Sequence, residues 1–289
     1  MRWGGHREST NLEDRRGLGL GGAGVGIGLG GILLVLIVSV LTGVNPLALL
    51  NMVETAQEMS SPPKTEATPP TDELGRFAAA DLADTEETWK AMLPKLGQPY
   101  QEPRLVLFTG AVRSACGLGS SAVGPFYCPP DEKISLDLSF FHELAQRFGA
   151  PGDFAQAYVI AHEVGHHVQN LPGIAERVNR LQHQSSSAEA NALSVRMGLQ
   201  ADCLAGVWGY QAQRDRALIE PGDFEEGLRA ASAIGDDRLQ HLSHGSVQPE
   251  SWTHGSSEQR ARWLRRGLKT DDPSACDTFI ASSDGSPFP

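Results

Sequence analysis

The feature that most constrains this chain is a long run without charge. Residues 17–50 contain no Asp, Glu, Lys or Arg, and their most apolar part lies at residues 25–44. A helix of about 20 apolar residues has the length needed to cross a bilayer. We therefore expect a transmembrane signal anchor at residues 25–44, after a tail and glycine-rich lead-in at residues 1–24. The alternatives are a cleaved signal peptide and a glycine-rich loop followed by a short apolar segment.

The basic residues around this run predict its orientation. The first Lys after the run is Lys64, whereas four arginines precede it: Arg2, Arg7, Arg15 and Arg16. Basic residues are retained on the cytoplasmic side of a membrane helix. We therefore expect a single-pass protein with a cytoplasmic N-terminus and with its remaining residues on the outer side of the membrane.

The rest of the chain is expected to contain a linker and one folded domain. Residues 45–71 end in a stretch rich in Pro, Ser and Thr, a composition that cannot bury a core. Helical and alternating patterns predict an α+β domain at residues 72–289, mainly helical with a small β-sheet. Helices are expected at residues 72–93, 139–149, 153–170, 187–214, 223–235 and 256–267, and strands at residues 104–110 and 133–141.

The net charge of the chain argues against one class of partner. The formal charge is −11 at pH 7. An acidic surface repels the phosphate backbone of nucleic acids. We therefore expect no nucleic-acid partner.

The four cysteines predict two disulfides. All of them follow the apolar run, and an oxidising compartment on the outer side would favour disulfide bonds. Cys116 and Cys128 flank a Gly/Pro-rich stretch in which a local bridge is easy to form. This leaves Cys203 to pair with Cys276. The chain has no C-x-x-C zinc motif, so structural cysteines are favoured over metal-binding ones.

The expected helix at residues 153–170 carries a pattern typical of a metal site. Within DFAQAYVIAHEVGHHVQN, His162 and His166 lie four residues apart and therefore share one face. Glu163 follows the first histidine, where a carboxylate can take a proton from a water that the metal has acidified. The surroundings are too apolar for a solvent-exposed face. We predict that His162 and His166 bind Zn²⁺ and that Glu163 is the general base.

Two histidines leave a zinc site one protein ligand short, and the next long helix is the place to look for the third. Asp202 is the charged residue on its apolar stripe. An aspartate in such a position is either paired or bound to a metal. We name Asp202 as a candidate ligand, with a hydrogen bond to a histidine or to a helix end as the alternative.

Several longer motifs of the chain match a known family. They are GPFYCP, DLSFF, GDFAQAYVIAHEVGHHVQN, LSVRMGLQADCLAGVWG, AIGDDRLQ and THGSSEQR. Together with the N-terminal segment, they resemble the YpfJ-type neutral zinc metallopeptidases almost from end to end. The resemblance implies a zincin-like fold, peptide or protein substrates, and a domain exposed outside a bacterial inner membrane. It also implies the zinc and base roles of His162, His166 and Glu163.

The chain departs from the family at one position. The family pattern ELQAD supplies a glutamate ligand, whereas this chain reads GLQAD and has Gly198 there. Three accounts remain open: Asp202 replaces the ligand, a water replaces it and the site is weaker, or the protein is catalytically inactive. In the THGSSEQR segment, His254 or Arg260 could stabilise an oxyanion, although both also fit an ordinary helix start.

These patterns predict a zinc-dependent peptidase. The alternatives are a catalytically inactive, membrane-tethered peptide-binding protein and a metal-binding scaffold with partners in the membrane. For either peptide-handling function, the strand expected at residues 133–141 is a candidate edge for pairing with an extended peptide.

Overall fold

The computed structural model describes residues 1–17 and 69–279. Within these ranges, one sheet has the order β1-β2-β6-β5. Its strands are β1 (Leu12–Asp14), β2 (Arg104–Phe108), β6 (Lys133–Asp137) and β5 (Phe126–Cys128). Strands β1, β2 and β6 run parallel, and β5 runs antiparallel to β6. A separate antiparallel hairpin joins β3 (Ala111–Ser114) to β4 (Gly117–Ser120).

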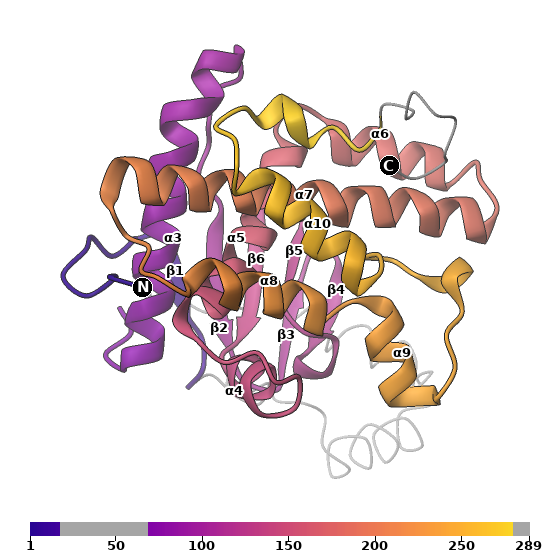
Figure 1. The fold of residues 1–289 in the computed structure, drawn as a ribbon, viewed down its shortest axis with the longest axis horizontal. Helices are drawn as coiled ribbons and strands as arrows, with labels where there is room; N and C mark the ends of the chain where they lie inside the picture. Colours follow the sequence, from indigo (N-terminus) through magenta and orange to yellow (C-terminus); the bar gives the residue numbers. More distant parts are fainter. Residues whose placement is uncertain (18–68, 280–289) are drawn as a thin grey trace, which may run out of the picture.

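The helices make up most of the described fold. Figure 1 shows α3 at one side of the molecule and α9 at the other. The helices are α3 (Glu73–Met92), α4 (Ser139–Gln146), α5 (Asp153–Asn170), α6 (Ile174–Gln182), α7 (Ser187–Arg216), α8 (Asp223–Ala233), α9 (Asp236–His244) and α10 (Ser257–Gly267). The 3₁₀ turns are Leu93–Leu96, Ser121–Val123, Pro249–Ser251 and Pro273–Cys276. The fold class is α+β with a small sheet, which confirms the prediction at this level.

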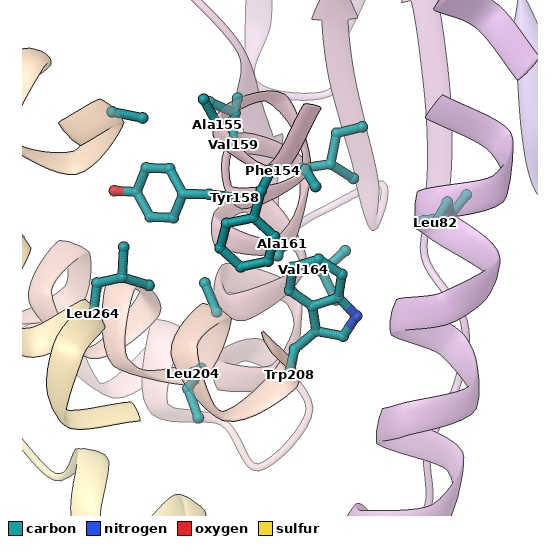
Figure 2. Packing of buried hydrophobic residues seen from close by; sticks show 14 of the residues in the cluster. Leu82, Phe154, Ala155, Tyr158, Val159, Ala161, Val164, Leu204, Trp208 and Leu264 are labelled. Atoms are coloured by element: carbon teal, nitrogen blue, oxygen red, sulfur yellow. The ribbon is translucent and has the colours of Figure 1, made fainter. Parts of the chain in front are cut away.

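Helix α5 lies at the centre of the described fold because it is apolar on nearly all sides. It packs against α3, α6, α7, α8 and β5. The ring of Phe154 on α5 stacks on Trp208 of α7, with centroids 5.7 Å apart. Figure 2 shows this pair between Leu82 of α3 and Leu264 of α10. A helix that is hydrophobic all round must be buried, so the metal-site pattern on α5 is carried by a buried helix.

The first 17 residues belong to the same folded unit as residues 69–279. Strand β1 pairs with β2, and the Leu105 amide donates to the Asn11 carbonyl at 2.9 Å. The Ser9 amide donates to the Ala79 carbonyl of α3 at 2.9 Å. At the end of the segment, Arg16 contacts the carboxylate of Asp72. The sequence pattern had indicated only a polar tail here.

Several predicted features fall outside the described residues. The anchor at residues 25–44 and linker residues 45–68 are among them. Within the described part, no helix is long and apolar enough to cross a membrane. The predicted domain boundaries therefore stay predictions.

Both predicted disulfides are present. They join Cys116 to Cys128 and Cys203 to Cys276. The first ties the β3–β4 hairpin to β5, and the second ties the C-terminal 3₁₀ turn to α7. The cysteine pairing read from the sequence is confirmed.

The prediction that residues 133–141 form an edge strand is wrong. β6 ends at Asp137 and lies inside the sheet, with β2 on one side and β5 on the other. The following residues begin α4 at Ser139. The edge on this side is β5, which pairs with β6 and covers it.

Candidate active site

Helix α5 presents three chemically active side chains on its buried surface. His162 is 4% exposed and Glu163 is 8% exposed, and His166 lies one turn further along. The rings of His162 and His166 are nearly perpendicular, with centroids 4.8 Å apart. The i, i+4 spacing therefore brings the two imidazoles together, as the sequence predicted.

Each of these imidazoles has one nitrogen held by a neighbouring side chain. His162 donates from Nδ1 to Asp202 Oδ1 at 2.7 Å. His166 donates from Nδ1 to Gln169 Oε1 at 2.8 Å. Gln169 is held in turn because its amide donates to Gln200 Oε1 at 2.9 Å. In the tautomer that donates from Nδ1, Nε2 carries the free lone pair, which is the form that binds a metal.

Asp202 is surrounded by donors. Its Oδ1 accepts from the Tyr158 hydroxyl at 2.6 Å and from Arg260 Nη2 at 2.9 Å, and its Oδ2 accepts from Arg260 Nε at 2.9 Å. Burial alone would raise the pKa of Asp202, but the charge of Arg260 and the hydrogen bonds from His162 and Arg260 hold it well below the usual range. The geometry favours a carboxylate that orients His162. Ligation of a metal by Asp202 stays a prediction.

Arg260 makes its hydrogen bonds to groups inside the protein. Its guanidinium is buried and donates to Asp202, to the Tyr158 hydroxyl at 2.9 Å and to the Ile234 carbonyl at 3.2 Å. The side chain therefore positions Asp202, and through it His162. Because these hydrogen bonds engage the guanidinium of Arg260, they argue against the oxyanion role that the sequence suggested for it.

The side chain of Glu163 lies where α5 packs against β5, the edge strand of the sheet. Burial raises the pKa of its carboxyl group, and the nearby His162 and Arg260 and a hydrogen bond from the Tyr127 backbone of β5 oppose that rise. The carboxylate is thus beside the first histidine and next to β5, the last strand of the sheet.

His167 takes no part in the metal face. Its Nδ1 accepts from the Tyr127 hydroxyl at 3.0 Å, and its Nε2 donates to the Gln101 carbonyl at 2.6 Å. Both ring nitrogens of His167 are therefore engaged in hydrogen bonds within the protein.

Small residues let α7 approach α5 at the site. A Cβ added to Gly165 would lie 3.0 Å from the carbonyl oxygen of Ala201. The absence of a side chain at Gly165 therefore brings Asp202, the next residue on α7, within reach of His162.

A neighbouring loop lies against Gly198 of α7. A Cβ added to Gly198 would lie 3.2 Å from His254 Cα and 3.3 Å from its carbonyl oxygen. The ring of His254 faces that of His162, with centroids 6.5 Å apart. Within residues 1–17 and 69–279, no three His, Cys, Asp or Glu side chains meet the geometry of a metal site.

The family follows from comparison with known proteins. The model of the family described as "Putative neutral zinc metallopeptidase" matches residues 1–279. The chain belongs to this family. The match includes the N-terminal segment that forms β1 and the residues that surround His162.

Two relatives of this family member span much of its length. A protein of Escherichia coli (strain K12), named Uncharacterized protein YpfJ, is 49% identical over 287 residues, which cover 96% of this chain and 99% of the relative. Uncharacterized protein Mb2605 of Mycobacterium bovis is 44% identical over 210 residues, 69% of each chain. No solved structure matches the chain.

The sequence did not reveal every residue that shapes the site. Gln169 and Tyr158, which hold His166 and Asp202, are one helical turn from the histidines, but nothing in the pattern distinguishes them from core residues. Asp236 is a third case. Its Oδ2 accepts the successive amides of Thr253, His254 and Gly255 at 2.8, 2.6 and 2.9 Å. The motif AIGDDRLQ contains Asp236 and was the available signal.

Proposed function

We propose that the protein is a membrane-anchored zinc metallopeptidase that hydrolyses peptide bonds, with Glu163 as its general base. One observation carries the proposal. His162 and His166 lie side by side on α5, and both use Nδ1 for a side-chain hydrogen bond, so both can offer Nε2 beside a buried carboxylate. The family description supports the same chemistry.

The two histidines fit a zinc ion. Ligating imidazoles donate their other N–H to a carboxylate, a carbonyl or a water, and here Asp202 and Gln169 accept those bonds. A ligand histidine must also be neutral, and burial lowers the pKa of His166 to about 3. When bound, zinc supplies a Lewis acid that polarises a peptide carbonyl and lowers the pKa of water.

Glu163 moves the protons of the reaction. Its carboxylate accepts a proton from the attacking water and later passes that proton to the leaving amine. Burial raises the pKa of Glu163, which makes the carboxylate a stronger base than an exposed glutamate. The same environment keeps other water away from the proton while it is held.

Strand β5 is the proposed place for an extended substrate. It forms the outer edge of the sheet and lies against α5. A peptide that adds to such an edge gains main-chain hydrogen bonds without regard to its sequence. It would pass Glu163, since the Tyr127 backbone of β5 contacts this carboxylate.

The proposed location is the outer side of a bacterial inner membrane, with residues 25–44 as the membrane attachment and, because β1 pairs with β2, with residues 1–17 on the same side as residues 69–279. The two disulfides support an oxidising compartment for residues 69–279. The anchor itself rests on the sequence pattern, because residues 25–44 lie outside the described ranges.

The experiment for this proposal is the substitution Glu163→Gln in the full-length protein. It should abolish hydrolysis of a casein-type substrate while zinc content, measured by atomic absorption, stays the same, because the base is lost and neither imidazole changes. Glu176→Gln is the matched control, since the Glu176 side chain is 74% exposed on α6. Activity that survives in Glu163→Gln would remove Glu163 from the mechanism.

A second function is a peptide-binding protein without catalysis. The observation in its favour is Gly198, which removes the family's glutamate ligand. Purified protein that contains no zinc and does not hydrolyse casein, yet retains peptide binding, would establish this alternative.

A further inference from the structure

We propose that His254 is the third protein ligand of the zinc ion and occupies the place that Gly198 leaves open. This inference rests on the proposed function, because it completes the same zinc site. The site otherwise has two imidazoles, whereas catalytic zinc sites normally have three protein ligands and one open position.

The backbone around His254 is seated directly on Gly198. A Cβ at Gly198 would lie 3.2 Å from His254 Cα, so a side chain there would require the His254 backbone to shift by a few tenths of an ångström. The next residue, Gly255, has a φ of +97°, and a Cβ there would lie 3.1 Å from Leu199 of α7. The glycine on α7 and the turn at Gly255 therefore let this loop approach the helix that normally carries the ligand.

The loop is held in place by a dedicated carboxylate. Asp236, at the start of α9, accepts the backbone N–H groups of Thr253, His254 and Gly255 through one oxygen. The Asp236 amide donates to the Gly255 carbonyl at 2.9 Å. Hydrogen bonds to a charged acceptor are among the stronger ones in proteins, so the backbone that presents His254 is fixed before any metal binds.

The three histidines share one hydrogen-bonding pattern. His254 Nδ1 lies 3.0 Å from the Thr253 hydroxyl, just as the Nδ1 atoms of His162 and His166 meet the side-chain oxygens of Asp202 and Gln169. In the tautomer that donates from Nδ1, Nε2 of each ring is available to a metal. Metal-bound histidines usually donate their other ring N–H to an oxygen acceptor such as a carboxylate, a carbonyl or a water.

One ring separation matches that of two imidazoles on one zinc ion, and a second is longer. Rings bound through nitrogen to one zinc ion at about 2.0–2.1 Å have centroids roughly 5 Å apart in tetrahedral geometry. His162 and His166 are 4.8 Å apart, and His162 and His254 are 6.5 Å apart. The His254 side chain is 50% exposed, and the proposal requires its ring to turn toward His162 when zinc binds.

The test compares zinc affinity and ligand number in the full-length protein. Affinity is measured by competition with a fluorescent chelator, and the number of bound imidazoles by X-ray absorption of the zinc form. We expect three imidazoles in the unaltered protein and two in His254→Gln, with zinc affinity lower by more than about 100-fold. Loss of a residue that only supports a ligand costs about 10–100-fold. The exposed His183 provides the control His183→Gln, which should change neither quantity.

A rescue variant separates ligation from other roles. Glutamate at position 198 would supply the family's ligand, at the cost of a shift of a few tenths of an ångström in the His254 loop. We expect Gly198→Glu to strengthen zinc binding far more in the His254→Gln background than in the unaltered protein, because the two side chains then serve the same coordination position.

The outcomes distinguish this inference from the function on which it rests. If zinc binds tightly and His254→Gln loses activity without any change in affinity or imidazole number, His254 stabilises the reaction and is not a ligand. The zinc peptidase would then stand and the inference would fail. If the unaltered protein binds no zinc, or binds it with an affinity that His162→Ala does not change, both the inference and the proposed zinc peptidase fail.

Discussion

Asp81 is a buried carboxyl group in α3 without a partner. It is 1% exposed, and within the described residues neither carboxyl oxygen accepts or donates a hydrogen bond. Burial, followed by the negative charge of Asp84, raises its pKa well above the usual value. The folded protein therefore keeps this proton at pH values where the unfolded chain, with an aspartate pKa of about 3.9, has lost it.

This difference makes a pH-dependent prediction. Between the unfolded and the folded pKa the native state binds more protons, so stability falls as pH rises from about 4 toward the folded pKa. Asp81→Asn keeps the shape of the neutral acid and removes the titration. We expect Asp81→Asn to be more stable than the unaltered protein at pH 8, by about 1.4 kcal/mol for each unit of pKa shift, and similar to it near pH 4.

Urea unfolding at both pH values checks this result. Glu143→Gln, which removes a carboxylate from the surface of α4, is the control and should leave the pH dependence unaltered. Equal stability of Asp81→Asn and the unaltered protein at pH 8 would mean that Asp81 is ionised and compensated in the folded state.

At the site, the sequence identified the residue types but not always their partners. The spacing of His162, Glu163 and His166 identified one helical face, because helix geometry alone fixes it. Asp202 could only be assigned to either a ligand or a hydrogen bond. Its donors Tyr158 and Arg260 come from α5 and α10, and a sequence does not show which distant residues meet. The tertiary packing determines which of these two roles Asp202 has.

At the scale of elements, the crossing of α7 and α10 depends on backbone contact. A Cβ added to Gly267 of α10 would lie 1.9 Å from the Cys203 carbonyl oxygen and 2.8 Å from Gly206 Cα. We predict that Gly267→Ala destabilises the fold by about 1–3 kcal/mol, the typical cost of overpacking. The gain in helix propensity is at most about 1 kcal/mol, so the steric cost wins.

The same substitution at Gly4 is the control. A Cβ there meets nothing within 4 Å, so Gly4→Ala should change the free energy of unfolding by less than about 0.5 kcal/mol. Thermal unfolding of the two variants and the unaltered protein measures both effects. An unchanged melting temperature for Gly267→Ala would mean that α10 can move away from α7 without loss.

The sequence predicted long elements better than short ones. The helix at residues 153–170 was predicted with its observed bounds, and the end of the helix that begins at residue 187 differs by two residues. Helices α6 and α9, by contrast, are short, with few buried residues, so their apolar stripes gave little signal. Strands β1 and β5 have three residues each. They exist through pairing with β2 and β6, which local patterns do not contain.

At the scale of the whole molecule, the packing of the N-terminal segment is incompatible with a single membrane crossing at residues 25–44. A single crossing at residues 25–44 would place residues 1–17 and residues 69–279 on opposite sides of a membrane. The pairing of β1 with β2, and the contact between Arg16 and Asp72, require both parts on the same side. One molecule cannot satisfy both at once.

Labelling of single cysteines decides between the two arrangements. The four native cysteines are all in disulfides, so Gly4→Cys and Gln184→Cys each introduce one free thiol at an exposed position. We expect a membrane-impermeant maleimide to label both variants in intact spheroplasts, because the packing of β1 keeps residue 4 with residue 184. Labelling after lysis gives the total reactive thiol for each. If residue 184 is labelled in intact spheroplasts and residue 4 only after lysis, the N-terminus is cytoplasmic. Strand β2 would then lack β1 in the membrane-bound protein and leave the row of main-chain groups from Arg104 to Phe108 open to another strand.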